Sequence, residues 1–147
     1  MATARDLIKG KENSSIFLIS ADSTALDAMK LMAKHNVGAL LVKGVDGSIQ
    51  GIISERDFIL KVEVLGRIPQ ETPIGEILTA NVLYVEGSQS LEECMGLMNE
   101  KSIRHLPVFE GKKLIGMISI RDVLREIIAE QKSMISHLEH YIRGGAQ

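Results

Sequence analysis

The sequence predicts an α+β fold built from two copies of one β-α-β-β-α unit and ending in an extended C-terminal helix. Two observations carry this prediction: an internal repeat and the same order of hydrophobic patterns in each copy. The chain has 147 residues, of which 45% are hydrophobic and 24% are charged, which suits one compact domain. We therefore expect the repeats to pack as a pseudo-twofold pair, sheet against sheet, rather than as independent domains.

The repeat is visible in two blocks of residues. Residues 28–32 (AMKLM) match residues 94–98 (CMGLM) at an offset of 66. Residues 51–57 (GIISERD) match residues 116–122 (GMISIRD) at an offset of 65. One residue has been lost between the two blocks, in a segment that is typical of a hairpin loop. Because the register holds on both sides of this loop, the similarity is a true repeat.

Each copy presents the same elements in order. In the first copy, a strand at 16–19 precedes a helix that begins at Ser23 or Thr24, and the hairpin signal Asp46-Gly47 separates two further strands. The predicted elements are strands 37–42 and 48–53 and a helix from Ser54 to about Leu65, then strand 82–85, helix 91–101, strands 106–109 and 114–118 and a helix from Ser119. Short helices at 4–9 and 73–78 precede the two copies.

These patterns set the predicted boundaries. The first repeat with its N-terminal helix covers residues 1–66, a linker covers 67–72, the second repeat covers 73–130, and a helical extension with a frayed tail covers 131–147. Apolar residues recur at helical spacing through the extension, where little core remains to be covered. We therefore expect this part to pack in a homodimer.

Composition excludes several classes of protein. The net charge is −2, which argues against a nucleic-acid partner. No apolar run approaches the roughly 18 residues of a membrane span, and no signal peptide is visible. The single cysteine, Cys94, is expected to be a small buried side chain rather than a nucleophile. Together these features predict a cytoplasmic protein without a membrane partner.

The repeated motif Gly-h-h-Ser-x-Arg-Asp, where h is apolar, is the candidate site. Ser54 and Ser119 stand where a strand meets a helix N-terminus, which suits an anion or phosphate. Asp57 and Asp122 can accept hydrogen bonds from the paired hydroxyls of a ribose. The alternative is structural, because Ser-x-x-Asp also resembles a capping box. Two copies in matching places weaken that alternative without removing it.

The doubled β-α-β-β-α pattern, ending each time in this motif, resembles a tandem CBS-domain protein, or Bateman module, of the small stand-alone type. The resemblance covers essentially the whole chain and implies a non-catalytic regulatory module. Similar modules bind AMP, ADP, ATP, S-adenosylmethionine or NAD(H) in two clefts between the repeats and act as energy or redox sensors. The resemblance thus implies an adenine nucleotide as ligand, no metal, and a regulated protein partner that the sequence does not identify.

Carried over by register, the resemblance assigns residues to two clefts. One joins Ser119 and Asp122 to Ile16, Phe17, Val37, Gly38 and Ala39; the other joins Ser54 and Asp57 to Thr79, Val82, Leu83, Ile103, Arg104 and His105. The cationic Arg104 suits phosphate oxygens, so we expect the Asp57 cleft to prefer a charged nucleotide. Arg56 and Arg121 are further phosphate candidates, or else solvated arginines on a helix face.

Three histidines are weaker candidates for a catalytic or metal site. His105 has no positioned partner in the sequence for a role as a general base. His137 and His140 share a spacing compatible with a metal, but exposed helix histidines near a dimer contact explain them better, because no third ligand is visible. An enzyme is therefore not expected. The main alternative to nucleotide sensing is a protein-interaction scaffold with vestigial nucleotide clefts.

Overall fold

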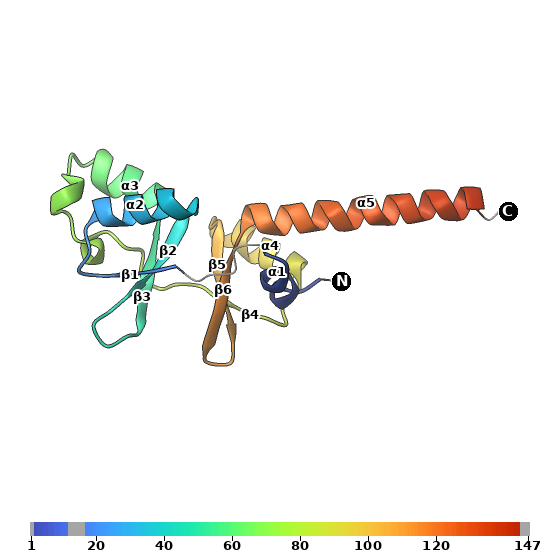
Figure 1. Cartoon of the computed structure of the whole chain (residues 1–147), viewed down its shortest axis with the longest axis horizontal. Coiled ribbons are helices and arrows are strands. Elements are labelled where there is room, and N and C mark those ends of the chain that lie inside the picture. The colour runs from blue at the N-terminus through green and yellow to red at the C-terminus, as the bar shows by residue number, and fades with distance from the viewer. Residues whose placement is uncertain (1, 12–16, 145–147) are drawn as a thin grey trace. The chain divides into compact units, whose positions relative to one another are not determined.

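The computed structural model describes residues 2–11 and 17–144, which form two compact units. The first-repeat unit contains residues 17–83, and the second-repeat unit contains residues 2–11 together with 84–144. Each unit holds one sheet of three strands with helices beside it (Figure 1). The α+β class and the long C-terminal helix are therefore confirmed, whereas the packing of the units against each other stays a prediction.

The first-repeat unit is built around the sheet β1-β2-β3. Strand β1 pairs with β2 in parallel, and β2 pairs with β3 in antiparallel. The elements are β1 (Leu18–Ser20), α2 (Ala25–His35), β2 (Ala39–Lys43), β3 (Ile49–Ser54), α3 (Glu55–Phe58), a π-helical turn (Ile59–Glu63) and two short 3-10 helices (Pro69–Glu71 and Ile74–Glu76).

The second-repeat unit has the same sheet topology, in the order β4-β5-β6. Strand β4 runs parallel to β5, and β5 runs antiparallel to β6. The elements are α1 (Ala4–Gly10), β4 (Val85–Glu86), α4 (Leu91–Lys101), β5 (His105–Glu110), β6 (Lys113–Ser119) and α5 (Ile120–Gly144).

Local sequence explains where the two central helices begin and end. The Thr24 hydroxyl accepts a hydrogen bond from the Asp27 N–H at 3.2 Å, and the Asp27 carboxylate accepts one from the Thr24 N–H at 3.1 Å. Ser90 caps α4 in the same way, accepting from the Glu93 N–H. Both helices end at a residue in the left-handed region, Asn36 and Ser102, which stops the helical path.

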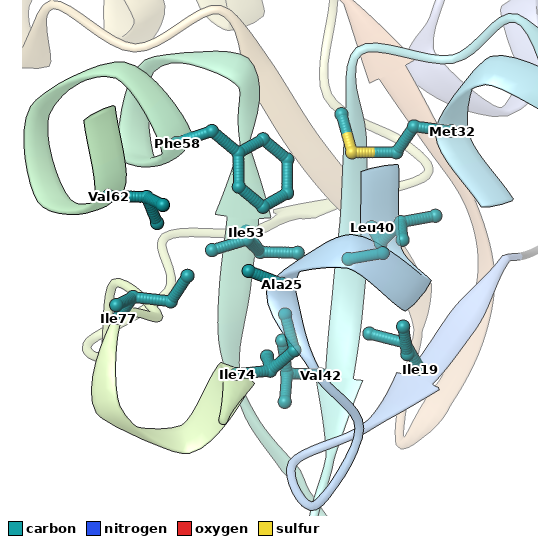
Figure 2. Close-up of a cluster of buried hydrophobic side chains, with 11 residues drawn as sticks. Ile19, Ala25, Met32, Leu40, Val42, Ile53, Phe58, Val62, Ile74 and Ile77 are labelled. Carbon is teal, nitrogen blue, oxygen red and sulfur yellow. The ribbon is translucent and has the colours of Figure 1, made fainter. Parts of the chain in front are cut away.

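The segment that leads into each repeat packs in the unit of the other repeat. Ile74 and Ile77, in the short segment with which the predicted second repeat begins, are buried in the first-repeat core with Leu40 and Ile53 (Figure 2). In the other unit, Ile8 of α1 is buried beside Ile118 and Val123. Each leading segment therefore completes a core made mostly by the other repeat.

Some elements differ from the sequence expectation. The strand predicted at 82–85 is instead Val85–Glu86, since these two residues pair with Val108 and Phe109 of β5. The helix predicted from Ser54 to about Leu65 has a single short α-helical stretch and continues as a π-helical turn. The apolar spacing reports which side chains face the core, and it does not fix the hydrogen-bonding pattern.

Among residues 2–11 and 17–144, no helix is both long enough and apolar enough to cross a bilayer.

Candidate functional site

The two copies of the Ser-x-Arg-Asp motif lie where the last strand of each sheet passes into the next helix. In the first-repeat unit, the Asp57 side chain folds back onto Ser54. Its Oδ2 accepts a hydrogen bond from the Ser54 N–H at 2.9 Å and another from the Ser54 hydroxyl at 3.2 Å. Asp57 is only 7% exposed, so its carboxylate is nearly buried. The contact is the return arm of a capping box.

The second oxygen of Asp57 is also engaged within the chain. Oδ1 accepts a hydrogen bond from the Thr79 hydroxyl at 2.9 Å and forms an ion pair with the Lys61 ammonium at 2.9 Å. Lys61 further donates to the carbonyl of Ile77 at 3.0 Å. This Lys61–Asp57–Thr79 cluster connects the helical turn after β3 to the segment 77–79.

Asp122 has a matching environment in the second-repeat unit. Its Oδ2 accepts from the Ser119 N–H at 2.9 Å, and the Asp122 N–H donates to the Ser119 hydroxyl at 3.1 Å, which completes a capping box. The Lys11 ammonium lies 2.9 Å from the same oxygen and donates to the carbonyl of Met117. Partial burial acts to raise the pKa of Asp122, but the Ser119 and Lys11 contacts outweigh it, so the pKa lies below its ordinary value.

The first backbone N–H groups of the two motif helices are not free. The Glu55 N–H donates to the Gly38 carbonyl at 3.3 Å, and the Ile120 N–H donates to the Arg104 carbonyl at 2.8 Å. The first N–H of each motif helix is therefore bonded to the residue just before β2 or β5, and the Asp122 N–H is bonded to the Ser119 hydroxyl. Helix α3 has 4 α-helical residues and continues directly as the π-helical turn Ile59–Glu63.

The glycines of the motif accommodate the protein's own chain. A Cβ on Gly51 would lie 2.5 Å from the Thr79 carbonyl oxygen, because Ile52 and Thr79 exchange backbone hydrogen bonds there. A Cβ on Gly116 would lie 2.5 Å from Cδ1 of Ile8 in α1. At each glycine, the missing side chain leaves room for the segment that leads into the other repeat.

The remaining predicted residues fall on both units. Phe17 stacks on His35 with ring centroids 4.1 Å apart, and the Arg56, Arg104 and Arg121 side chains are exposed. Ile16 lies outside the described residues. The first-repeat unit contains Phe17, Val37, Gly38, Ala39, Ser54, Arg56, Asp57, Thr79, Val82 and Leu83; the second-repeat unit contains Ile103, Arg104, His105, Ser119, Arg121 and Asp122.

Only part of the predicted Asp57 cleft is therefore assembled within one unit. Ser54, Asp57 and Thr79 are hydrogen-bonded neighbours. The predicted cleft around Asp122 draws on residues of both units and stays a prediction.

Sequence reasoning missed two lysines, Lys61 and Lys11. Lys61 follows Asp57 at the i, i+4 spacing, which places the two side chains on one helix face and was a readable signal. Lys11 is 111 positions from Asp122, and no local pattern links them. Their positions put an ammonium group beside each motif carboxylate.

The other reactive groups form no further site in the described parts of the chain. Burial raises the pKa of the Cys94 thiol to about 11, so Cys94 remains a protonated core side chain. His137 and His140 are exposed on α5. Among residues 2–11 and 17–144, no three His, Cys, Asp or Glu side chains gather closely enough to hold a metal ion.

Known proteins resemble this chain over most of its length. A curated relative, the mitochondrial CBS domain-containing protein CBSX3 of Arabidopsis thaliana, is 39% identical over 150 residues, covering 97% of this chain and 73% of the relative. A solved structure from Burkholderia ambifaria, described as a signal-transduction protein with CBS domains, is 47% identical with a TM-score of 0.83, covering 88% and 96% of the two chains. Because the curated relative is mitochondrial, the predicted cytoplasmic location is not established.

A third relative corrects the expectation about bound groups. The Hypoxic response protein of Mycobacterium tuberculosis is 28% identical over 127 residues, covering 86% of each chain. Its solved structure has two coordinated zinc ions and a TM-score of 0.68 to this chain. The expectation that such a module binds no metal is therefore corrected, because a relative holds zinc. None of these comparisons shows a nucleotide.

Self-association also occurs among the structural neighbours. A CBS-CP12 protein from bloom-forming cyanobacteria is hexameric and matches this chain with 27% identity and a TM-score of 0.74, over 84% of this chain and 70% of that one. Oligomers are therefore compatible with this fold.

The family is shown by the sequence itself as well as by these relatives. The CBS domain family matches the chain twice, at residues 4–63 and 74–129. Its members are generally regulatory modules without catalytic activity, and no enzyme family is indicated for this chain. The chain belongs to the CBS domain family, as a tandem CBS protein.

Proposed function

We propose that this chain is a regulatory module that senses an adenosine-containing ligand, with AMP, ADP, ATP and NAD(H) as the candidates. One observation supports the proposal above others. Asp57 and Asp122 stand at equivalent places in the two repeats, each fixed by its own helix start and each beside a lysine. A fixed carboxylate can accept ribose hydroxyls, and a neighbouring ammonium can balance phosphate charge.

The carboxylates of Asp122 and Asp57 differ in the contacts that they already make within the chain. Within residues 2–11 and 17–144, the Lys11 ammonium and the Ser119 N–H both bond to Oδ2 of Asp122, and we propose Oδ1 as the acceptor of a ribose hydroxyl. Oδ1 of Asp57 already binds Thr79 and Lys61, so a ribose there must displace one of these donors. We therefore propose that the Asp122 position binds the ribose more readily, and that the exposed Arg104 side chain meets phosphate oxygens.

The same contacts favour a second candidate function. Both oxygens of Asp57 are satisfied by the protein itself, and the buried carboxylate stabilises the turn around Thr79. This observation fits a protein-interaction scaffold in which the motif is purely structural. In that case Asp57 would affect unfolding and not ligand binding.

The test is a thermal-shift panel on nucleotide-stripped protein with AMP, ADP, ATP, NAD, NADH, zinc ions and GTP. A ligand at 100 times its Kd adds about 2.7 kcal/mol to the free energy of unfolding. We expect at least one adenine ligand to raise the Tm by roughly 5–10 °C and GTP to leave it unchanged.

Variants separate sensing from scaffolding. Asp57→Asn and Asp122→Asn should each reduce the adenine-ligand shift, because asparagine keeps a capping oxygen but loses the charge. The matched control is Asp46→Asn, in the turn at the opposite end of β2 and β3 from Ser54. The Asp46 carboxylate likewise accepts a hydrogen bond from a serine N–H, that of Ser48. If every ligand leaves the wild-type Tm unchanged, the scaffold function replaces the sensing function.

A further inference from the structure

Helix α5 carries a row of apolar side chains that its own unit does not cover. Near its start, Val123 is buried in the second-repeat core. Figure 1 shows the C-terminal part of α5 extending beyond the rest of this unit. Along the helix, seven large apolar side chains are between 42% and 76% exposed: Leu124, Ile128, Met134, Ile135, Leu138, Tyr141 and Ile142.

The spacing of this row follows a heptad repeat. Steps of four and three residues alternate through Leu124, Ile128, Gln131, Ile135, Leu138 and Ile142. Isoleucine occupies every a position of this register and leucine two of the three d positions, which are the residue types that coiled coils place in their seam. The period of 3.5 residues keeps the row on one side of a supercoiled helix. We call these six residues the α5 seam.

The two flanks of the α5 seam differ in chemistry. The g positions are Ile127, Met134 and Tyr141, so this flank is apolar. The e positions are Arg125, Lys132 and Glu139, so the other flank is charged. In an antiparallel pair of helices, g positions face g positions and e positions face e positions. In a parallel pair, the apolar flank of one helix would face the charged flank of the other.

We propose that the α5 seam binds the α5 seam of a second copy of this chain in an antiparallel coiled coil. In this arrangement Leu124 lies opposite Ile142 of the second copy, and Ile128 lies opposite its Leu138. Met134 faces Met134 of the second copy, and Tyr141 faces its Ile127, which already packs partly against its own second-repeat core. All seven exposed apolar side chains therefore lie at the contact.

Charge supports the same arrangement. Arg125 faces Glu139 of the second copy at each end of the coiled coil, which gives two pairs of opposite charge. Lys132 faces its counterpart at the centre, where water and salt screen the repulsion. The polar Gln131 interrupts the seam near its midpoint, which limits stability and helps to specify register. A membrane surface fits less well, since the remaining faces of α5 carry both signs of charge.

The rest of the molecule prepares α5 for this role. Val123 anchors the first turns of α5 in the second-repeat core. The rest of α5 extends a helix that is already nucleated, so association does not bear the free-energy cost of nucleation. The proposal does not depend on nucleotide binding, because the seam lies on α5 outside the Ser119–Asp122 motif.

Sedimentation velocity over a range of protein concentrations tests the association. We expect a dimer for the wild type and a Kd at least ~100-fold higher for Ile135→Glu, because a charge in the seam would be buried without a partner. The matched control is Ser133→Glu, which adds the same charge on the opposite face and should change the Kd by less than ~3-fold. A monomeric wild type, or equal Kd values for the two variants, would overturn the proposal.

Cysteine crosslinking tests the orientation, even where another surface also associates. Leu124→Cys and Ile142→Cys proteins should form a disulfide when mixed and none when oxidised separately. The native Cys94 should not form a disulfide in this experiment, since it is buried and its pKa is raised to about 11. Disulfides formed by either variant alone, with none between the two, would contradict the antiparallel coiled coil. Arg125→Glu should weaken the dimer, and adding Glu139→Arg to the same chain should restore it.

Discussion

At the scale of single residues, each motif aspartate has a structural role within its own repeat. Asp57 and Asp122 both close onto the serine that starts their helix, as the capping-box interpretation of the sequence anticipated. The sequence located these residues because serine and aspartate lie three positions apart. It could not show that Lys11 reaches Asp122, because that contact depends on tertiary packing across most of the chain.

The lowered pKa of Asp122 predicts a pH dependence of stability. A carboxyl whose pKa is lower in the folded state stabilises the fold above its unfolded value, near 3.8, and this contribution is lost as the pH falls through the folded value. In urea unfolding, Asp122→Asn should be less stable than the wild type by about 1 kcal/mol at neutral pH. The two proteins should converge at acidic pH. A constant difference between them at all pH values would show that Asp122 contributes nothing through its charge.

At the scale of elements, the two central helices were predictable and two other elements were not. The range predicted for α4 agrees with the structure, and α2 begins after Thr24, one of its two predicted caps, because capping residues flank a clear apolar face. Strand β4 is shorter than its apolar run, since only Val85 and Glu86 have partners in β5. The spacing of apolar residues did not predict the π-helical turn after Phe58, because Phe58 and Val62 face the core in either helix type.

The two motif glycines should respond differently to the same substitution. In Gly51→Ala the new Cβ meets the backbone carbonyl of Thr79, which cannot move without breaking the Ile52–Thr79 hydrogen bonds. In Gly116→Ala it meets the end of the Ile8 side chain, which can change rotamer. We expect a loss of about 3 kcal/mol for Gly51→Ala and about 1–2 kcal/mol for Gly116→Ala. Urea unfolding of the two variants checks the order, and equal losses would contradict the close approach of Thr79.

At the scale of the whole molecule, each repeat depends on a segment that lies next to the other repeat in the sequence. The predicted boundaries follow the repeat along the chain, with α1 assigned to the first repeat. The packing instead places α1 in the second-repeat unit and Ile74 and Ile77 in the first-repeat unit. Sequence spacing could not predict this exchange, because it gives the order of elements but not the sheet against which a short helix packs.

The exchange predicts where a core mutation acts. Ile8→Ala removes a buried side chain of α1 and should cost about 2–4 kcal/mol. Hydrogen exchange should then speed up in α4 and β6 of the second-repeat unit and remain nearly unchanged in α2 and β3. Ile77→Ala is the reciprocal control and should have the opposite pattern. Faster exchange in α2 and β3 with Ile8→Ala would mean that α1 packs on the first repeat.

Isothermal titration calorimetry of nucleotide-free protein with AMP, with GMP as the control, tests nucleotide binding most directly. We expect saturable binding of AMP, no binding of GMP, and loss of AMP binding in the double variant Asp57→Asn/Asp122→Asn while the far-UV spectrum stays that of a folded protein. AMP is the simplest candidate ligand, so the same titration is repeated with ADP, ATP and NAD(H). Absence of heat with all of them, or unchanged binding in the folded double variant, would contradict the assignment of the two aspartates to a nucleotide site.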